Sequence, residues 1–258
     1  MPAIFFALRK RVCDFTVTMI LWVYYIVGFL VLFSPFYLVA LFSRVNREEA
    51  FQRLNHRFHR RFFALLRILV PNVKWHISEE VKALRSCVII ANHLSFLDPL
   101  LFVSFFEKQK TIVKSDYFRF AVFGWILRTS GYIPSGVEGP FTVHMIDQIK
   151  NMKEYLSAGG NLFIFPEGTR SRDGRIGPFD SGAFKIARLC QATPIQVVFI
   201  RNTQKLFAPG SFLINACNET VIEVELAGAL EPDYESDAFS LSGLMAEART
   251  LMEKKAGL

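Results

Sequence analysis

The sequence has 258 residues, of which 52% are hydrophobic and 27 are phenylalanine, and its formal net charge is +7. This length allows one sizeable core, or one domain with a membrane appendage. The apolar composition and the positive charge together indicate an anionic membrane surface as partner, and they argue against nucleic acid, which does not account for the phenylalanines. The four cysteines form no C-x-x-C pair, which predicts a reducing compartment and no metal site.

The first informative segment runs from Phe15 to Ser43 and contains no charged residue. It is too apolar for the surface helix of a soluble domain and too long for a signal peptide, so we expect a membrane-embedded helical segment. Pro35 divides the segment, and basic residues such as Arg9 and Arg44 flank both ends, which places both ends on the cytoplasmic side. This pattern favours a short hairpin dipping into one leaflet, and a single tilted span with a kink at Pro35 is the alternative.

From residue 46 to residue 70, apolar residues recur at the three- and four-residue steps of a helix whose stripe packs on a core. The stripe consists of Phe51, Leu54, Phe58, Phe62, Leu65, Leu66 and Leu69. The arginines that lie off the stripe, free to meet lipid headgroups, are Arg53, Arg57, Arg60, Arg61 and Arg67. We expect His56 and His59 on this basic face. Residues 1–70 are therefore expected to form a membrane-associated helical part.

The remainder, residues 71–258, has the pattern of an α/β domain. The predicted strands cover residues 73–77, 87–91, 111–113, 132–133, 162–165, 194–198 and 220–226. Helical patterns separate most of them, and an amphipathic helix is expected over residues 242–255. Strands that alternate with helices predict a central mixed sheet flanked by helices.

A histidine and a carboxylate follow one of these strands. The apolar run from Cys87 to Ala91 breaks at His93, and Ser95 is expected to cap a helix that has Asp98 in its first turn. Helical side chains lean toward the N-terminus, so Asp98 points back at the loop that carries His93. A carboxylate that keeps one ring nitrogen protonated leaves the other free to act as a general base. The alternative is that Ser95 and Asp98 form only a capping pair.

A second polar loop follows the strand that stops at Pro166. Gly168 can take backbone angles closed to other residues, which lets an anionic group approach main-chain N–H groups. Arg170 offers a planar fork that matches a phosphate. A carboxylate, a glycine and an arginine at a strand end favour an anion site, and a structural ion pair between Glu167 and Arg170 is the alternative.

Both stretches resemble signatures of the glycerolipid acyltransferase family, whose bacterial members include 1-acylglycerol-3-phosphate acyltransferases. The first is N-H-x-x-x-x-D at residues 92–98, and the second is F-P-E-G-T-R at residues 165–170, matched residue for residue. They occur in the family's order and at roughly its spacing. The stretch around Lys114 and several later blocks are also similar to the family, so the resemblance covers residues 88–200.

The resemblance implies that His93 deprotonates an acceptor hydroxyl, which attacks a fatty acyl thioester, while Asp98 orients the histidine. The substrate-binding residues that it implies are Lys114, Glu167, Gly168, Thr169 and Arg170. It implies acyl-CoA or an acyl carrier protein as co-substrate, no further cofactor, and a lysolipid and membrane lipids as the other partners. It also implies a membrane location, the bacterial inner membrane, with the active site on the cytoplasmic face.

One departure from the family pattern concerns the acceptor. After Ile133 the family commonly carries an arginine that helps to bind the acceptor phosphate, whereas Pro134 follows here and Arg128 lies on the other side of the turn. The expected reaction converts 1-acylglycerol-3-phosphate into phosphatidic acid. A different lysolipid or hydroxylated acceptor, hydrolysis of the thioester, and a non-catalytic lipid-binding protein are the alternatives.

Overall fold

The computed structural model describes residues 2–42, 46–136, 139–192 and 194–257, so the expected segment end at Ser43 and its flank at Arg44 lie outside the described residues. The helices are α1 (Pro2–Val23), the π-helical η1 (Tyr24–Phe33), α2 (Ser34–Leu41), α3 (Arg47–Leu69), α4 (Glu79–Ala83), α5 (Leu97–Phe105), the 3-10 helix η2 (Ser115–Arg119), α6 (Ala121–Thr129), α7 (Thr142–Lys150), α8 (Met152–Ser157), α9 (Ser181–Leu189), α10 (Thr203–Leu206) and α11 (Leu241–Ala256). The strands are β1 (Val73–Ile77), β2 (Val88–Ala91), β3 (Gln109–Lys114), β4 (Ile133–Ser135), β5 (Asn161–Ile164), β6 (Ile195–Arg201) and β7 (Thr220–Leu230).

Within the described residues, seven strands form one sheet in the order β1-β7-β6-β2-β5-β3-β4. β2 pairs in parallel with β5 and β6, and β3 pairs in parallel with β5 and β4. β7 runs antiparallel to β6, which makes the sheet mixed. The predicted fold class is therefore confirmed. The carboxyl ends of β2, β5 and β3 lie at one edge, where ligands of parallel sheets commonly bind.

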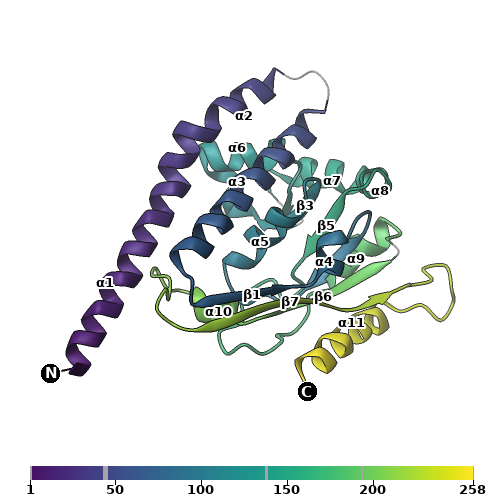
Figure 1. Cartoon of the computed structure of the whole chain (residues 1–258). Coiled ribbons are helices and arrows are strands. Elements are labelled where there is room, and N and C mark those ends of the chain that lie inside the picture. Colours follow the sequence, from purple (N-terminus) through teal and green to yellow (C-terminus); the bar gives the residue numbers. More distant parts are fainter. Residues whose placement is uncertain (1, 43–45, 137–138, 193, 258) are drawn as a thin grey trace.

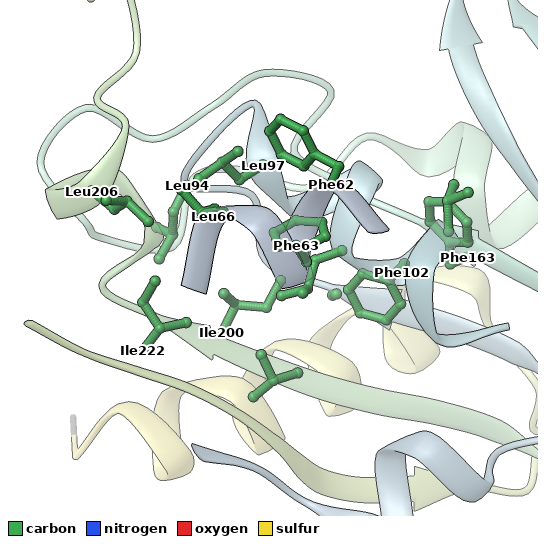
Figure 2. Close-up of a cluster of buried hydrophobic side chains, with 14 of the residues drawn as sticks. Phe62, Phe63, Leu66, Leu94, Leu97, Phe102, Phe163, Ile200, Leu206 and Ile222 are labelled. Atoms are coloured by element: carbon green, nitrogen blue, oxygen red, sulfur yellow. The ribbon is translucent and has the colours of Figure 1, made fainter. Parts of the chain in front are cut away.

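Successive strand residues face two different cores, as the period of a strand requires. On one face, Ile89 of β2 packs in a cluster with residues of α3 and α5, including Phe63 and Phe102. On the other face, Val88 packs with residues of α8, α9 and α11. Figure 2 shows the first cluster, to which the segment after β2 contributes Leu94 and Leu97. The loop after β2 is thus fixed to the core by its own apolar side chains.

The predicted helix over residues 46–70 is confirmed as α3, and its apolar stripe packs on the first core through residues such as Phe62. The arginines off the stripe are exposed, as expected. The expectation for the two histidines is wrong, because His56 is buried and its Nδ1 donates to the Val103 carbonyl at 3.2 Å. His59 donates to the Asn55 carbonyl at 2.8 Å. α3 lies between the sheet domain and the N-terminal helices, so its buried arc is wider than that of a surface helix.

The N-terminal helices α1, η1 and α2 form one continuous helix, called here the N-terminal helix, which runs along one side of the molecule (Figure 1). The π-helical stretch precedes Pro35, and Ser34 Oγ donates to the Leu30 carbonyl at 2.6 Å, so the chain passes the proline without reversing. The hairpin expected within residues 15–43 is not formed. Among the described residues, Ala7–Leu41 is the one helix long and apolar enough to cross a membrane.

A buried carboxylate holds the first half of the N-terminal helix to the domain. Asp14 Oδ1 accepts from Ala216 N at 2.8 Å, and Asp14 Oδ2 accepts from Lys10 Nζ at 2.6 Å. One turn later, Thr18 Oγ1 accepts from Ile214 N at 2.9 Å. Buried N–H groups need such partners, so these contacts fix the helix in position and orientation on the loop before β7.

Candidate active site

The loop that carries His93 leaves the sheet at Asn92. β2 and β6 are paired as far as Ala91, which lies opposite Val198. Asn92 Oδ1 then accepts from Ile200 N at 2.7 Å, and Asn92 Nδ2 donates to the Ile200 carbonyl at 2.9 Å. The carboxamide replaces a main-chain pair at the point where the main chain turns away, because it offers the same donor and acceptor. Asn92 therefore fixes the position from which His93 projects.

Asp98 lies in the first turn of α5, fully buried, and accepts three hydrogen bonds through Oδ2. The donors are His93 Nδ1 at 3.0 Å, Leu94 N at 2.6 Å and Ser95 N at 2.7 Å. Because a carboxylate can only accept, His93 Nδ1 carries the proton and Nε2 is left as an acceptor. The His93 ring stacks on Phe165 with 4.4 Å between centroids, and 16% of the His93 side chain is exposed.

Asp98 both caps the start of α5 and binds His93, so the two interpretations of this residue hold together. Asp98 accepts the N–H of Ser95, as a capping pair requires, but α5 begins at Leu97 and not at Ser95. Ser95 Oγ accepts from Leu97 N at 3.2 Å and donates to the Phe207 carbonyl at 2.7 Å. One carboxylate thus stabilises the helix start and orients His93. Sequence reasoning missed the contact with Phe207, because no local pattern links residues so far apart.

Glu167 joins the second loop to the first. Its Oε1 accepts from His93 N at 2.9 Å, and its Oε2 accepts from Gly177 N at 2.9 Å. Ser171 N donates to the His93 carbonyl at 2.7 Å. Burial raises the pKa of Glu167, while the two N–H donors oppose that shift. Both carboxylate oxygens accept from main-chain groups, so Glu167 ties the two loops together, and its expected contact with a headgroup stays a prediction.

The three residues after Glu167 form a turn beside the His93 loop. Gly168 has a φ of 63°, a left-handed conformation that favours glycine, and it is exposed. Thr169 is exposed and Arg170 is half-buried. The alternative of a Glu167–Arg170 ion pair is not formed among the described residues. The Arg170 fork and the exposed turn can therefore serve a ligand anion.

Lys114 lies farther out along the same edge. It ends β3, with β5 between β3 and the strand that carries His93, and its exposed Nζ lies 3.2 Å from the Asp116 carboxylate. Arg128 donates to the Phe118 carbonyl at 2.6 Å. A main-chain carbonyl of η2 thus holds the Arg128 guanidinium.

The chemistry of the site follows from which groups remain free. The N–H, the carbonyl and Nδ1 of His93 all have partners, whereas Nε2 has none among the described residues and can accept a proton. Within the described ranges, no three metal-ligating side chains come together. The site therefore places an oriented histidine beside an exposed turn, residues 168–170, at the carboxyl edge of an α/β sheet. We call this turn the anion loop after its expected role.

An oriented histidine beside such a turn is typical of α/β enzymes that take a proton from a bound anionic substrate. A family model described as Acyltransferase matches residues 72–201, half of the chain, from the segment of β1 to the end of β6. The match includes both loops of the site. The chain belongs to this acyltransferase family.

Several curated relatives support this assignment. The chain is 38% identical over 125 residues to the chloroplastic 1-acyl-sn-glycerol-3-phosphate acyltransferase BAT2 of Brassica napus, covering 48% of this chain and 36% of the relative. It is 32% identical to LPAT1 of Arabidopsis thaliana, covering 67% of this chain and 49% of the relative. A 1-acyl-sn-glycerol-3-phosphate acyltransferase of Pseudomonas aeruginosa is 29% identical, with 52% and 54% covered. The matched segments thus span about half or less of these relatives.

A solved structure shares the fold. The crystal structure of the 1-acyl-sn-glycerophosphate acyltransferase PlsC from Thermotoga maritima matches with a TM-score of 0.69 and 18% identity. The match covers 95% of this chain and 98% of the other. The fold is therefore shared beyond the family-model segment, and the N-terminal helix belongs to it.

Proposed function

We propose that this protein transfers a fatty acyl group from an acyl thioester to the free hydroxyl of a lysolipid. The observation that carries the proposal is the His93–Asp98 pair, with Nδ1 bound to a buried carboxylate and Nε2 left free. Membership of the acyltransferase family gives the reaction class. The names of the curated relatives point to 1-acylglycerol-3-phosphate as acceptor and phosphatidic acid as product.

In the proposed reaction, His93 Nε2 takes the proton of the acceptor hydroxyl while the hydroxyl oxygen attacks the thioester carbonyl carbon. The new C–O bond forms, the C–S bond breaks, and the leaving thiolate takes the proton back from the imidazolium. Asp98 holds Nδ1–H and stabilises the imidazolium between these steps. No covalent enzyme intermediate is needed, since Ser95 lacks the G-x-S-x-G elbow that exposes a serine nucleophile.

The anion loop would hold the headgroup of the acceptor. Gly168, Thr169 and Arg170 lie in the turn that adjoins His93, and an arginine fork matches a phosphate. Lys114, at the end of β3, would add positive potential at the outer side of the site. Acyl-CoA or an acyl carrier protein would be the co-substrate, and the reaction as written needs no cofactor.

We further propose that the N-terminal helix lies in the cytoplasmic leaflet of a membrane. From the sequence we expect this membrane to be the bacterial inner membrane. Its outer face carries large apolar side chains that are exposed along the whole length, for example Phe5, Phe15, Leu30 and Val39. The helix packs on α3 and also meets the α/β domain at both ends, through Asp14 with Ala216 and through the cluster that joins Tyr37 to Ile126. An upright crossing would therefore draw the domain into hydrocarbon, where its polar groups would lose water. An orientation along the membrane surface avoids that cost.

The experiment is acyl transfer by the purified full chain in mixed micelles. Acyl-CoA or acyl carrier protein thioester is supplied with lysophosphatidic acid, and with a panel of other lysolipids and alcohols. Phosphatidic acid that is lost in His93→Ala supports the proposal. Product from a different acceptor alone would identify that acceptor as the substrate. This is the second candidate, because the arginine expected after Ile133 is missing. Free fatty acid without acceptor would indicate hydrolysis, and lysolipid binding without product would indicate a binding protein.

A further inference from the structure

A compact group of exposed apolar side chains lies just after β3, and the proposed reaction does not use it. The group comprises Tyr117, Phe120, Val122 and Phe123, which are 39%, 58%, 54% and 40% exposed. The Tyr117 ring lies 6.2 Å from the Phe120 ring and 6.1 Å from the Phe123 ring, measured between centroids. We call these four residues the 117–123 patch. Contiguous exposed apolar surface of this kind marks interaction sites.

The patch is held on a rigid support. Phe118, in the middle of the segment, is buried, and its carbonyl accepts from Arg128 Nη1 at 2.6 Å. Gly124 N donates to the Phe120 carbonyl at 2.8 Å. A Cβ on Gly124 would lie 2.2 Å from the Phe118 carbonyl oxygen, so α6 packs on η2 more closely than any other residue would allow. The aromatic rings therefore face outward because the backbone places them there.

The patch adjoins the N-terminal helix. The inner face of α6 carries Trp125 and Ile126, which pack with Phe33 and Tyr37 of the N-terminal helix. Figure 1 shows α6 beside α2. The outer face of α2 is exposed at Val39, among other residues. The patch and the proposed membrane face of the N-terminal helix thus lie on elements that share one apolar cluster.

We propose that the 117–123 patch is a second membrane contact, which enters the headgroup region of an anionic bilayer. Arg119, between Tyr117 and Phe120, is exposed and has no ion-pair partner among the described residues. Lys114 precedes the patch, although Asp116 pairs with it. Aromatic side chains interleaved with cations are typical of segments at a lipid interface. A second copy of this chain would bring two Arg119 guanidinium groups together, which disfavours that occupant.

The second contact has a consequence for the site. A single helix on a membrane leaves the domain free to rotate about the helix axis, whereas two contacts fix that rotation. β3 ends at the same sheet edge as the strand that carries His93. The patch would therefore hold this edge, and the catalytic histidine, toward the membrane that supplies a lipid acceptor. This inference rests on the proposed membrane location and goes beyond it.

The test is fluorescence quenching by bilayer lipid with the full-length protein in phosphatidylcholine–phosphatidylglycerol vesicles. Trp22→Phe, Trp75→Phe and Trp125→Phe together provide a tryptophan-free background in which Phe123→Trp or Leu189→Trp is added. Vesicles with brominated acyl chains are compared with unbrominated ones. Leu189 is the matched control, because it is 69% exposed at the end of α9, on the other face of the sheet. We expect quenching at position 123 to exceed that at position 189 at least twofold. A protein that keeps Trp22 and carries Trp75→Phe and Trp125→Phe reports separately on the first contact, because Trp22 is 39% exposed on the N-terminal helix.

The outcomes separate the two proposals. Quenching of Trp22 with equal quenching at positions 123 and 189 would overturn the second contact and leave the first. An unquenched Trp22 would overturn the membrane location itself, whatever the acyl transfer assay shows. If the tryptophan at position 123 is not quenched by brominated lipid and the protein is a dimer in solution, the patch belongs to a contact with a second copy, and the proposal is overturned. As a second measurement, Phe120→Ser with Phe123→Ser should raise the KM for lysolipid several-fold in vesicles and leave the rate in detergent micelles unchanged.

Discussion

Replacing Asp98 by asparagine removes the charge beside His93 and keeps the shape. During the proposed reaction the imidazole becomes an imidazolium, with Nδ1 at 3.0 Å from Asp98 Oδ2. At that distance and an effective dielectric constant of about 20, the attraction between the two charges is about 5 kcal/mol. The asparagine oxygen recovers part of it as a dipole. Each 1.36 kcal/mol is a factor of ten in rate, so we expect kcat of Asp98→Asn to fall about 10²- to 10⁴-fold.

The same substitution should weaken the fold by a smaller amount. If the asparagine oxygen keeps the contacts with Leu94 N and Ser95 N, its amide nitrogen takes the place of Oδ1. That atom is buried and has no hydrogen-bond partner among the described residues. An unsatisfied donor there costs about 1–3 kcal/mol of stability. Thermal unfolding in detergent measures this loss separately from the rate.

The assay is steady-state acyl transfer with kcat and KM determined for acceptor and donor. Asp180→Asn is the matched control, because Asp180 also accepts an N–H at a helix start, from Gly182 at 2.6 Å, but belongs to α9. We expect the control to retain kcat within about twofold, as is usual for an exposed cap. A folded Asp98→Asn protein with kcat within threefold of the parent would refute the role of Asp98 in orienting a base.

Three further predictions concern other parts of the molecule. Glu167→Gln should lower kcat and leave the KM for lysolipid nearly unchanged, because Glu167 holds the loop of His93 through His93 N. Steady-state kinetics that show the reverse would support the expected headgroup contact instead. Asn92→Leu leaves the N–H and carbonyl of Ile200 unpaired, and should lower the free energy of unfolding by about 2–4 kcal/mol in denaturant titration. Burial lowers the pKa of His59 to about 4, so the native state resists its protonation. Stability should be full above the unfolded pKa of about 6.5 and fall as pH drops toward 4, and His59→Gln should lose that slope in pH-dependent unfolding.

Local patterns in the sequence were sufficient for the strands, for the long helices α3 and α11, and for the two loops of the site, but they did not predict the short helices α4, α8 and α10. The apolar run before His93 predicted β2 to within one residue, and the period of apolar residues predicted α3. Asp98 lies within reach of His93 because both belong to one strand-loop-helix unit of few residues. Such contacts depend on the backbone geometry of neighbours in sequence, which residue type and spacing encode.

Contacts between distant segments were decided by the tertiary structure alone. In the sequence, the neighbours of Glu167 indicate an anion site. Only the pairing of β2 with β5 brings Glu167 to its main-chain partners, His93 N and Gly177 N. His59 looked like part of a basic face, but α3 packs between the domain and the N-terminal helix, so His59 is half-buried beside Tyr25. Pro35 indicated a reversal, and the π-helical stretch before it lets the helix continue. Local sequence fixes which conformations are favourable, but the partner that each polar group finds depends on which surfaces the fold brings together.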